Sequence, residues 1–350
     1  MELVTNISDN VSKEEVKEMI ISAAKMLNSY GISSCQSDDF ETIKCVNYEM
    51  FNEVINELIK ENKLSVRINE QCQFSTINKL KDFINKGLNK QGNEFFKMGP
   101  LKILGDGSLG ARTAYMSKPY YDDPTTSGLL CLTEEDLHEM ITYASNNDMQ
   151  LAIHAIGDKC LDIVLDEYEK VIENSNKKDH RHGIVHCQIS RDDQLKRMID
   201  LGVHIYAQSI FLDYDISIVH GRVNDLARTS YSWKTLLDGG LVVSNGSDCP
   251  VELPNVLGGI KCAVTRCTLK NTYGPYLPYQ AFSVKEAIDS YTYAGAIASF
   301  EEDYKGLIKE NYLADFVVLD KSPFDVDKQD IDSIKVVETY VDGKLVYRNN

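Results

Sequence analysis

The sequence predicts an α/β fold in which parallel strands alternate with helices and form a barrel. Strand-like apolar runs alternate with amphipathic helical stretches along most of the chain, which is typical of a parallel sheet covered by helices. In addition, Lys102, His154, His186 and Asp248 all lie at or near the C-terminal ends of predicted strands. Barrels place their functional groups at those ends, and each group comes from a different strand.

Taken in order, seven strand-like segments are each coupled to a helical stretch. The first helix, residues 14–31, has apolar residues at helical spacing and ends on Gly31, a favourable C-cap. The helix at 133–148 opens with a Thr-x-x-Asp cap. The other predicted helices cover residues 51–62, 76–88, 159–175, 191–202, 231–240 and 284–300, and the predicted strands cover residues 32–37, 64–74, 100–108, 151–158, 182–189, 203–212 and 241–248.

A count of seven is one short of an eight-stranded barrel, and a doubly wound open sheet also holds seven strands. Residue spacing favours the barrel. His154 and His186 are 186 − 154 = 32 residues apart, about one βα unit, and Asp248 follows His186 by 248 − 186 = 62 residues, about two units. Period-two alternation also places Ile184, His186 and Gln188 on one face of their strand.

The last part of the chain changes character. We expect the barrel to occupy residues 1–303 and a small β segment to occupy residues 304–350, because short β-type runs there alternate with turn residues. Asp342 and Gly343 between two such runs are a strong hairpin signal.

Composition bounds the class of function. The chain has 43% hydrophobic residues, enough for a large core, and 53 acidic against 37 basic residues give a net charge of −16. This excess of acid argues against nucleic acid or an anionic membrane as a partner. Residues 1–10 lack the pattern of a secretory signal and no apolar run is long enough to span a membrane, so we expect a cytoplasmic protein. The nine cysteines are scattered without a C-x-x-C pair and are expected to be reduced thiols. A homo-oligomer is left open.

Two histidines and an aspartate at one end of a barrel suit a divalent metal such as zinc. Such a metal lowers the pKa of water, and a nearby carboxylate can take the proton. Taken singly, each residue also has a structural explanation: a strand-end histidine is often a hydrogen-bonded core group, and an aspartate after Gly-Ser is often a turn residue. A position shared by several such residues favours the functional interpretation.

Five segments resemble the YtcJ-like branch of the amidohydrolase superfamily, amidohydrolase family 3, which also includes enzymes like N-substituted formamide deformylase. The resemblance runs over nearly the whole chain. The motifs "DGSLGARTA" and "HAIGD" are quite specific to this branch. The resembling segments are residues 101–114, 154–169, 181–189, 245–252 and 306–320.

The resemblance implies a metal-dependent (β/α)₈ hydrolase that acts on amide-like, non-peptide C–N bonds of small molecules. By the same resemblance, His154 and His186 are metal ligands, and Asp248 binds metal and moves protons as the catalytic residue. Lys102 matches a lysine that can be N-carboxylated to supply carboxylate ligands in relatives.

The resemblance also implies that Asp106 and Arg112, just after the strand that carries Lys102, shape the substrate pocket. The alternative, that this segment is only a tight loop with a structural ion pair, stays open.

The sequence departs from the family pattern chiefly at the metal site. Relatives carry a His-x-His pair on the first barrel strand, whereas the seven histidines here form this spacing once, at His180 and His182. His180 and His182 precede their strand and so lie at the wrong end. We therefore expect strand one to be missing, the chain to be a truncated form or fragment, and at most one divalent ion, zinc-like, to bind. Val185 replaces a usual glutamate, and Asn311 replaces a glycine in a turn that asparagine also tolerates.

Two other functions are weighed against this hydrolase. One is a non-catalytic barrel remnant that binds a metal or a partner, which the missing His-x-His pair favours. The other is an unrelated barrel metalloenzyme such as a phosphotriesterase-like lactonase, which "DGSLGAR" disfavours.

Overall fold

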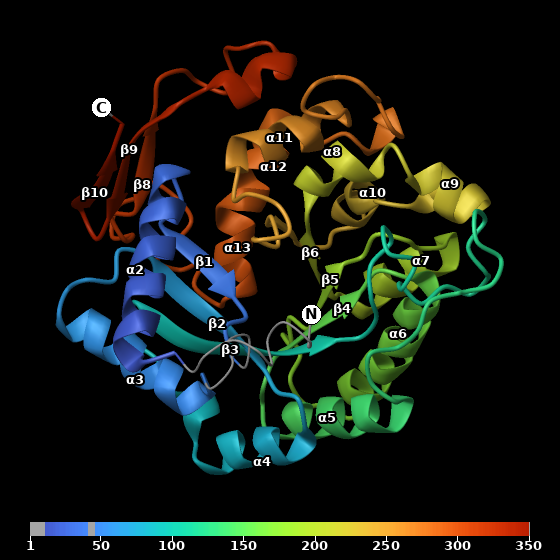
Figure 1. Ribbon diagram of the computed structural model, residues 1–350, viewed down its shortest axis with the longest axis horizontal. Coiled ribbons are helices and arrows are strands. Elements are labelled where there is room, and N and C mark those ends of the chain that lie inside the picture. The colour runs from blue at the N-terminus through green and yellow to red at the C-terminus, as the bar shows by residue number, and fades with distance from the viewer. Residues whose placement is uncertain (1–10, 41–45, 350) are drawn as a thin grey trace. The chain divides into compact units, whose positions relative to one another are not determined.

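The structure, a computed structural model, describes residues 11–40 and 46–349 (Figure 1). The prediction about a secretory signal at residues 1–10 lies outside this part. The chain forms two compact units. The first comprises Met1–Lys102, Ile308–Asp320 and Val336–Asn350, and the second comprises Ile103–Leu307 and Lys321–Lys335. The predicted division between residues 303 and 304 stays a prediction.

The seven predicted strands form one sheet whose order follows the chain, β1 to β7. The pairs β1–β2, β2–β3, β4–β5, β5–β6 and β6–β7 are all parallel. A doubly wound sheet reverses its strand order part-way, whereas a barrel adds strands in sequence. The predicted α/β class with barrel topology is therefore confirmed. The strands are β1 (Ser34–Ser37), β2 (Arg67–Gln73), β3 (Phe96–Leu104), β4 (Leu151–Ala155), β5 (Gly183–His186), β6 (His204–Ala207) and β7 (Val243–Asn245).

In the first unit, helices α2 (Lys13–Ser29), α3 (Tyr48–Lys60) and α4 (Ile77–Asn85) accompany β1, β2 and most of β3. An aromatic cluster fills its core, with ring centroids 5.0–6.1 Å apart. Burying several aromatic rings together supplies much of the apolar area of such a core. The cluster comprises Phe40, Tyr48, Phe51, Phe74 and Phe83.

The C-terminal strands belong to this same first unit. β8 (Phe316–Leu319), β9 (Val336–Val341) and β10 (Lys344–Arg348) form an antiparallel sheet that packs against α2, as Figure 1 shows. Arg67 of β2 donates from Nε to Oδ2 of Asp315 at 2.6 Å and from Nη2 to Oδ1 at 3.1 Å. Both side chains are buried, so this bidentate pair fixes the small sheet to the start of β2.

The second unit carries β4 to β7 and the helices that follow them. Its longer helices are α5 (Glu134–Asn146), α6 (Asp158–Glu173), α7 (Asp192–Leu201), α11 (Val256–Thr265) and α12 (Val284–Tyr291), and its short ones are α8 (Leu212–Asp215), α9 (Val219–Val223), α10 (Trp233–Asp238) and α13 (Tyr293–Ala298). Single 3₁₀ turns cover Leu88–Lys90 in the first unit and Ser209–Phe211, Asn224–Thr229, Pro278–Gln280 and Lys328–Ser333 in the second.

Several local predictions are confirmed. Thr133 caps α5 by accepting from the Asp136 backbone N–H at 3.1 Å. The β9–β10 hairpin turns at Asp342 and Gly343, whose φ angles of 55° and 69° are those of a type I′ turn. Asn311 adopts the left-handed conformation expected of it, with φ 68°.

Among the segments that differ from the prediction, two are explained by their residues. The strand predicted at 203–212 ends at Ala207, and the rest forms a 3₁₀ turn and α8. Helix α11 was not predicted, because two adjacent glycines lower its helix propensity and most of its side chains are buried, which leaves no polar face to mark the period. Within residues 11–40 and 46–349, no helix combines the length and apolar character needed to cross a membrane.

Candidate functional site

His154 and His186 lie next to each other at the C-terminal ends of adjacent strands. His154 is the fourth residue of β4 and His186 is the last residue of β5, and the register pairs Ala155 with His186. The ring centroids are 4.3 Å apart and the ring planes meet at 72°. The second unit therefore holds two imidazoles in contact with each other. Imidazoles are common ligands of zinc and other divalent metals.

The ring of His154 is held through one of its nitrogens. Nε2 lies 3.0 Å from the backbone oxygen of Gly107 and 3.2 Å from Oδ1 of Asp106. A carbonyl oxygen only accepts, so Nε2 must carry the proton that it donates. In the neutral ring Nδ1 then carries the lone pair and is the nitrogen available to a metal.

Asp106 lies just after β3 and is almost fully buried. Its Oδ2 accepts from the backbone N–H groups of Tyr115 and Gly157, both at 2.8 Å. Its Oδ1 accepts from the N–H of Ile156 at 3.0 Å and also faces His154. The carboxylate thus joins the loop after β3 to the turn between β4 and α6.

Glycines allow the loop after β3 and the turn between β4 and α6 to approach each other closely. A Cβ added at Gly157 would lie 2.1 Å from the backbone oxygen of Tyr115, and one at Gly107 would lie 2.2 Å from Oγ1 of Thr113. Both distances are shorter than any real carbon contact, so a side chain at Gly157 would clash with the backbone of Tyr115 and one at Gly107 with the side chain of Thr113. The motifs "DGSLGARTA" and "HAIGD" therefore interlock physically.

Arg112, in the same loop, forms an ion pair at the surface. Its Nε and Nη2 donate to the carboxylate of Asp122 at 3.1 and 3.0 Å, and Arg222 donates to that carboxylate as well. The hydrogen bonds from Arg112 lower the pKa of Asp122, with Arg222 contributing further. This is the structural ion pair that the sequence left open, and the prediction of substrate binding by Arg112 stays a prediction.

The backbone of His186 adopts an unusual conformation. Its φ of 74° is left-handed, and Cys187 follows with φ 49°. Left-handed backbone at a residue other than glycine costs of order 1–3 kcal/mol and persists where neighbours impose it. Trp233 supplies one such constraint, because its buried indole Nε1–H donates to the backbone oxygen of His186 at 2.9 Å. The ring of Phe211 stacks on the imidazole with centroids 5.9 Å apart.

A second buried network lies two residues beyond His186. Gln188 accepts at its backbone oxygen from the N–H of Tyr231 at 2.7 Å. Gln188 Nε2 and the Tyr231 hydroxyl both donate to Oδ2 of Asp215, at 3.1 and 2.8 Å. Burial, with a smaller contribution from the nearby Glu252, raises the pKa of Asp215 to about 6, against the opposing hydrogen bonds from Tyr231 and Gln188.

Sequence patterning marked only one member of this region. Alternation placed Gln188 on the same strand face as His186. Nothing marked Asp215, Tyr231 or Trp233, because they act through hydrogen bonds between segments far apart in the chain and no periodic pattern reports such bonds.

The other two predicted ligands are an exposed turn residue and a residue of the first unit. Asp248 is an exposed turn residue three positions after β7, with φ 54°, and its backbone oxygen accepts from Val251. Lys102 belongs to the first unit, where its Nζ lies 3.5 Å from Oδ2 of Asp38, the residue that follows β1. Their metal-binding roles stay predictions.

The donor set fits a divalent metal in part. Across residues 11–40 and 46–349, no three or more His, Cys, Asp or Glu side chains are grouped so that they could hold a metal ion. The histidine pair supplies two nitrogen donors, and the bond from His154 Nε2 to Gly107 leaves Nδ1 free of a proton in the neutral ring. His154 and His186 are thus the residues that would hold such an ion, with ligands beyond these two required.

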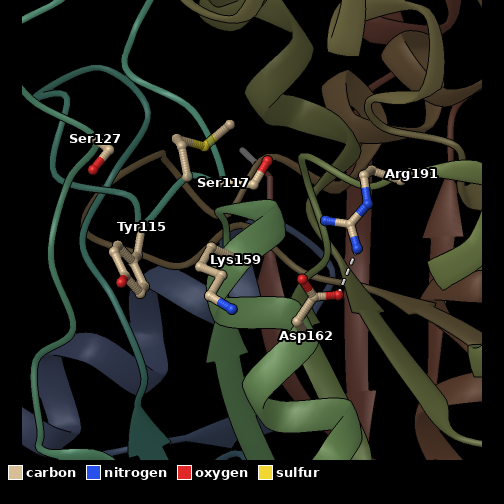
Figure 2. Close-up of a pocket in the computed structure, with 7 residues that line it drawn as sticks. Tyr115, Ser117, Ser127, Lys159, Asp162 and Arg191 are labelled. Carbon is tan, nitrogen blue, oxygen red and sulfur yellow. Dashed lines mark hydrogen bonds and ion pairs between the residues drawn. The ribbon is translucent and has the colours of Figure 1, made fainter.

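A pocket of about 430 Å³ opens beside the start of α6, lined by Tyr115, Met116, Ser117, Ser127, Lys159, Asp162 and Arg191 (Figure 2). Neither His154 nor His186 lines it. Arg191 donates to Asp162 at 2.6 Å, the bond drawn in Figure 2, and to Asp158 at 2.8 Å. The guanidinium is thus already engaged by carboxylates, so this pocket is a less suitable site than the histidine pair.

Comparison with known proteins decides the family. A profile of the amidohydrolase family matches residues 2–347, nearly the whole chain. The chain belongs to the amidohydrolase family. The resemblance drawn from the five motif segments is thereby confirmed, and the interlocked glycine motifs are part of the matched region.

Individual relatives agree with this membership. The protein YtcJ of Bacillus subtilis (strain 168) is 29% identical over 351 residues, covering 100% of this chain and 64% of its own length. The N-substituted formamide deformylase of Arthrobacter pascens is 31% identical over 222 residues, covering 61% of this chain and 40% of its own. The crystal structure of an uncharacterized metal-dependent hydrolase from Pyrococcus horikoshii OT3 superposes with a TM-score of 0.79 at 29% identity, covering 91% of this chain and 62% of that one. The chain therefore spans less than two thirds of the length of these relatives.

Proposed function

We propose that this chain is part of a metal-dependent hydrolase that cleaves a C–N bond in a small, amide-like, non-peptide substrate. The observation that carries the proposal is the contact between His154 and His186 at adjacent strand ends, with Nε2 of His154 already engaged by Gly107. Family membership supports the hydrolytic class. The names of two relatives, a metal-dependent hydrolase and an N-substituted formamide deformylase, support the metal and the bond type.

In this proposal His154 and His186 hold one divalent ion, zinc by preference, with Lys102 and Asp248 as further ligands. Bound there, the ion polarises a carbonyl group and makes water a nucleophile near neutral pH. The limit of one ion is proposed because the one His-x-His pair in this sequence, His180 and His182, precedes its strand and so offers no ligands for a second ion.

The remaining roles fall to groups around the histidines. The carboxylate of Asp248 accepts the proton released when water attacks and passes it to the leaving nitrogen. Arg112 is proposed to contact the substrate from the loop after β3. Asp106, which accepts three backbone N–H groups from this loop and the turn after β4, is proposed to shape the pocket by holding the loop in place.

A second candidate function is a non-catalytic barrel that binds a metal or a partner. The lack of a His-x-His pair at the C-terminal end of a strand favours it, because loss of a second ion removes one source of charge stabilisation in amide hydrolysis.

Elemental analysis and a hydrolysis assay on the same preparations test both candidates. We expect the purified protein to hold up to one equivalent of zinc, His154→Ala and His186→Ala to lose it, and N-substituted formamides to release formate in a reaction that Asp248→Asn abolishes. Zinc binding without turnover would favour the non-catalytic candidate. Zinc retained in both histidine variants would overturn the proposed site.

A further inference from the structure

Asp106 contacts two kinds of partner through its two oxygens. Oδ2 accepts only backbone N–H groups, from Tyr115 and Gly157 at 2.8 Å each. Oδ1 accepts from the backbone of Ile156 at 3.0 Å and lies 3.2 Å from Nε2 of His154. One oxygen therefore clamps the loop, while the other also touches the ring of a proposed metal ligand.

The three backbone bonds determine where the carboxylate sits. Each buried N–H needs an acceptor, and the three come from two segments that meet at the end of β4. A carboxylate anchored by three fixed donors has little freedom to rotate. Its Oδ1 is consequently a fixed acceptor beside the imidazole, in addition to the backbone oxygen of Gly107 at 3.0 Å.

The surroundings of Nε2 favour one tautomer, because this nitrogen hydrogen-bonds to the backbone oxygen of Gly107 and a carboxylate oxygen of Asp106 lies 3.2 Å away. The neutral imidazole has one N–H, and both Gly107 O and Asp106 Oδ1 lie at Nε2. The proton is best placed on Nε2, which leaves the lone pair on Nδ1. Carboxylates that hold the second nitrogen of a ligating histidine orient the ring and strengthen the ligand.

We propose that Asp106 is a positioning residue for His154, holding the imidazole with its proton on Nε2 so that Nδ1 is the nitrogen presented to a metal. The tautomer follows from the structure alone, and its use in metal binding rests on the proposed function. Asp106 acts in this account through His154 and does not itself touch substrate.

Asp158 provides a matched control. It too is a fully buried carboxylate at the same junction, and it accepts from the N–H of Ser117 at 2.8 Å and from its hydroxyl at 2.5 Å. It also pairs with Arg191 at 2.8 Å. Asp158 therefore clamps the same loop to the start of α6, and no contact with His154 is recorded for it. A purely structural role predicts that Asp106→Asn and Asp158→Asn behave alike.

The test reads the tautomer directly in the metal-free protein. Nitrogen NMR of ¹⁵N-histidine-labelled protein at pH 8.5, with His154→Gln for assignment, distinguishes protonated from unprotonated ring nitrogens. We expect the wild type and Asp158→Asn to show His154 with its proton on Nε2. Asp106→Asn should populate the other tautomer in part, because the amide NH₂ places a donor beside Nε2 while the backbone oxygen of Gly107 still accepts there.

A zinc titration of the same proteins gives the second readout. We expect Asp106→Asn to bind zinc about 10- to 100-fold more weakly than the wild type, as for other partners of ligating histidines, and Asp158→Asn to lose less. A tautomer change without zinc binding by the wild type would leave the positioning role standing and overturn the proposed metal site. Unchanged His154 signals in a folded Asp106→Asn would overturn the positioning role. Should that variant fail to fold, a wild-type His154 carrying its proton on Nδ1 would overturn it equally.

Discussion

The two histidines of the site are held in different ways. His154 has its ring fixed by side-chain and carbonyl acceptors at Nε2, from a loop that precedes it in the chain. His186 has its backbone fixed in a left-handed conformation, with its carbonyl bound by Trp233 from a segment that follows it. Ring contacts select a tautomer, whereas backbone contacts select the direction in which the side chain leaves the strand. The comparison predicts that the two supports fail differently when they are removed.

The largest effect is expected at Trp233, because its side chain is fully buried and supports His186. Trp233→Ala should lower the free energy of unfolding by about 3–5 kcal/mol. Trp233→Phe keeps most of the ring but leaves the His186 carbonyl without its donor, and should lose about 1–3 kcal/mol. Urea unfolding measures both. Equal stability of Trp233→Phe and the wild type would mean that the indole bond does not hold His186.

The network behind His186 should make stability depend on pH. Burial raises the pKa of Asp215 to about 6 from 3.8, with Glu252 adding to the rise and the Tyr231 hydroxyl opposing it. Because the folded protein binds this proton more tightly than the unfolded chain, the contribution is full below pH 3.8 and is lost as the pH rises through 6. The loss amounts to about 3 kcal/mol in total.

Asp215→Asn tests this dependence, because an amide does not have to ionise in its buried position. Urea unfolding between pH 4 and pH 7 should show a flatter profile for Asp215→Asn than for the wild type. The exposed Asp225→Asn serves as the control and should follow the wild type. A wild-type slope that persists in Asp215→Asn would assign the pH dependence to another group.

The His154 side is tested at the glycine that allows its junction to close. In Gly157→Ala the new methyl group would meet the backbone of Tyr115, so we expect a loss of about 1–3 kcal/mol together with a disturbed His154 ring. Gly295→Ala in α13, where a Cβ meets nothing within 4 Å, is the matched control and should be neutral or slightly stabilising. Similar losses in the two variants would argue against a close junction.

The smallest effect on stability is expected at Arg112. Its ion pair with Asp122 is partly exposed, and Arg222 binds the same carboxylate. Arg112→Ala should change the free energy of unfolding by at most about 1 kcal/mol. A substrate-binding role predicts a raised KM in any hydrolysis assay, with Arg228→Ala, another surface pair, as the control. An unchanged KM would contradict the substrate-binding role and leave Arg112 with a structural role in its loop.

Much of the fold could be predicted from the sequence, because it depends on periodic patterns and on local turn chemistry. The alternation of strands and helices gave the parallel sheet, and Asp342 and Gly343 gave the hairpin. The strand-end positions of His154 and His186 also predicted that the two side chains lie close together, because neighbouring parallel strands end at the same edge of the sheet. These features follow from residues close in sequence or one βα unit apart.

The residues that hold His154 and His186 in place could not be predicted in this way. The partners of Asp106 are backbone N–H groups, which every residue except proline carries and which no sequence pattern marks. Trp233 and Asp215 act on segments 47 and 27 residues away, across loops without a period. Residues that hold a functional group in place thus leave weaker traces in a sequence than the functional group itself.

The most direct test of the account is zinc K-edge X-ray absorption on the zinc-loaded protein, compared with His154→Ala and His186→Ala. The account predicts two imidazole ligands in the wild type at Zn–N distances of about 2.0–2.1 Å, and one in each variant that still binds zinc. Zinc bound by sulfur at about 2.3 Å, from some of the nine cysteines, or a histidine signal unchanged in both variants would contradict it.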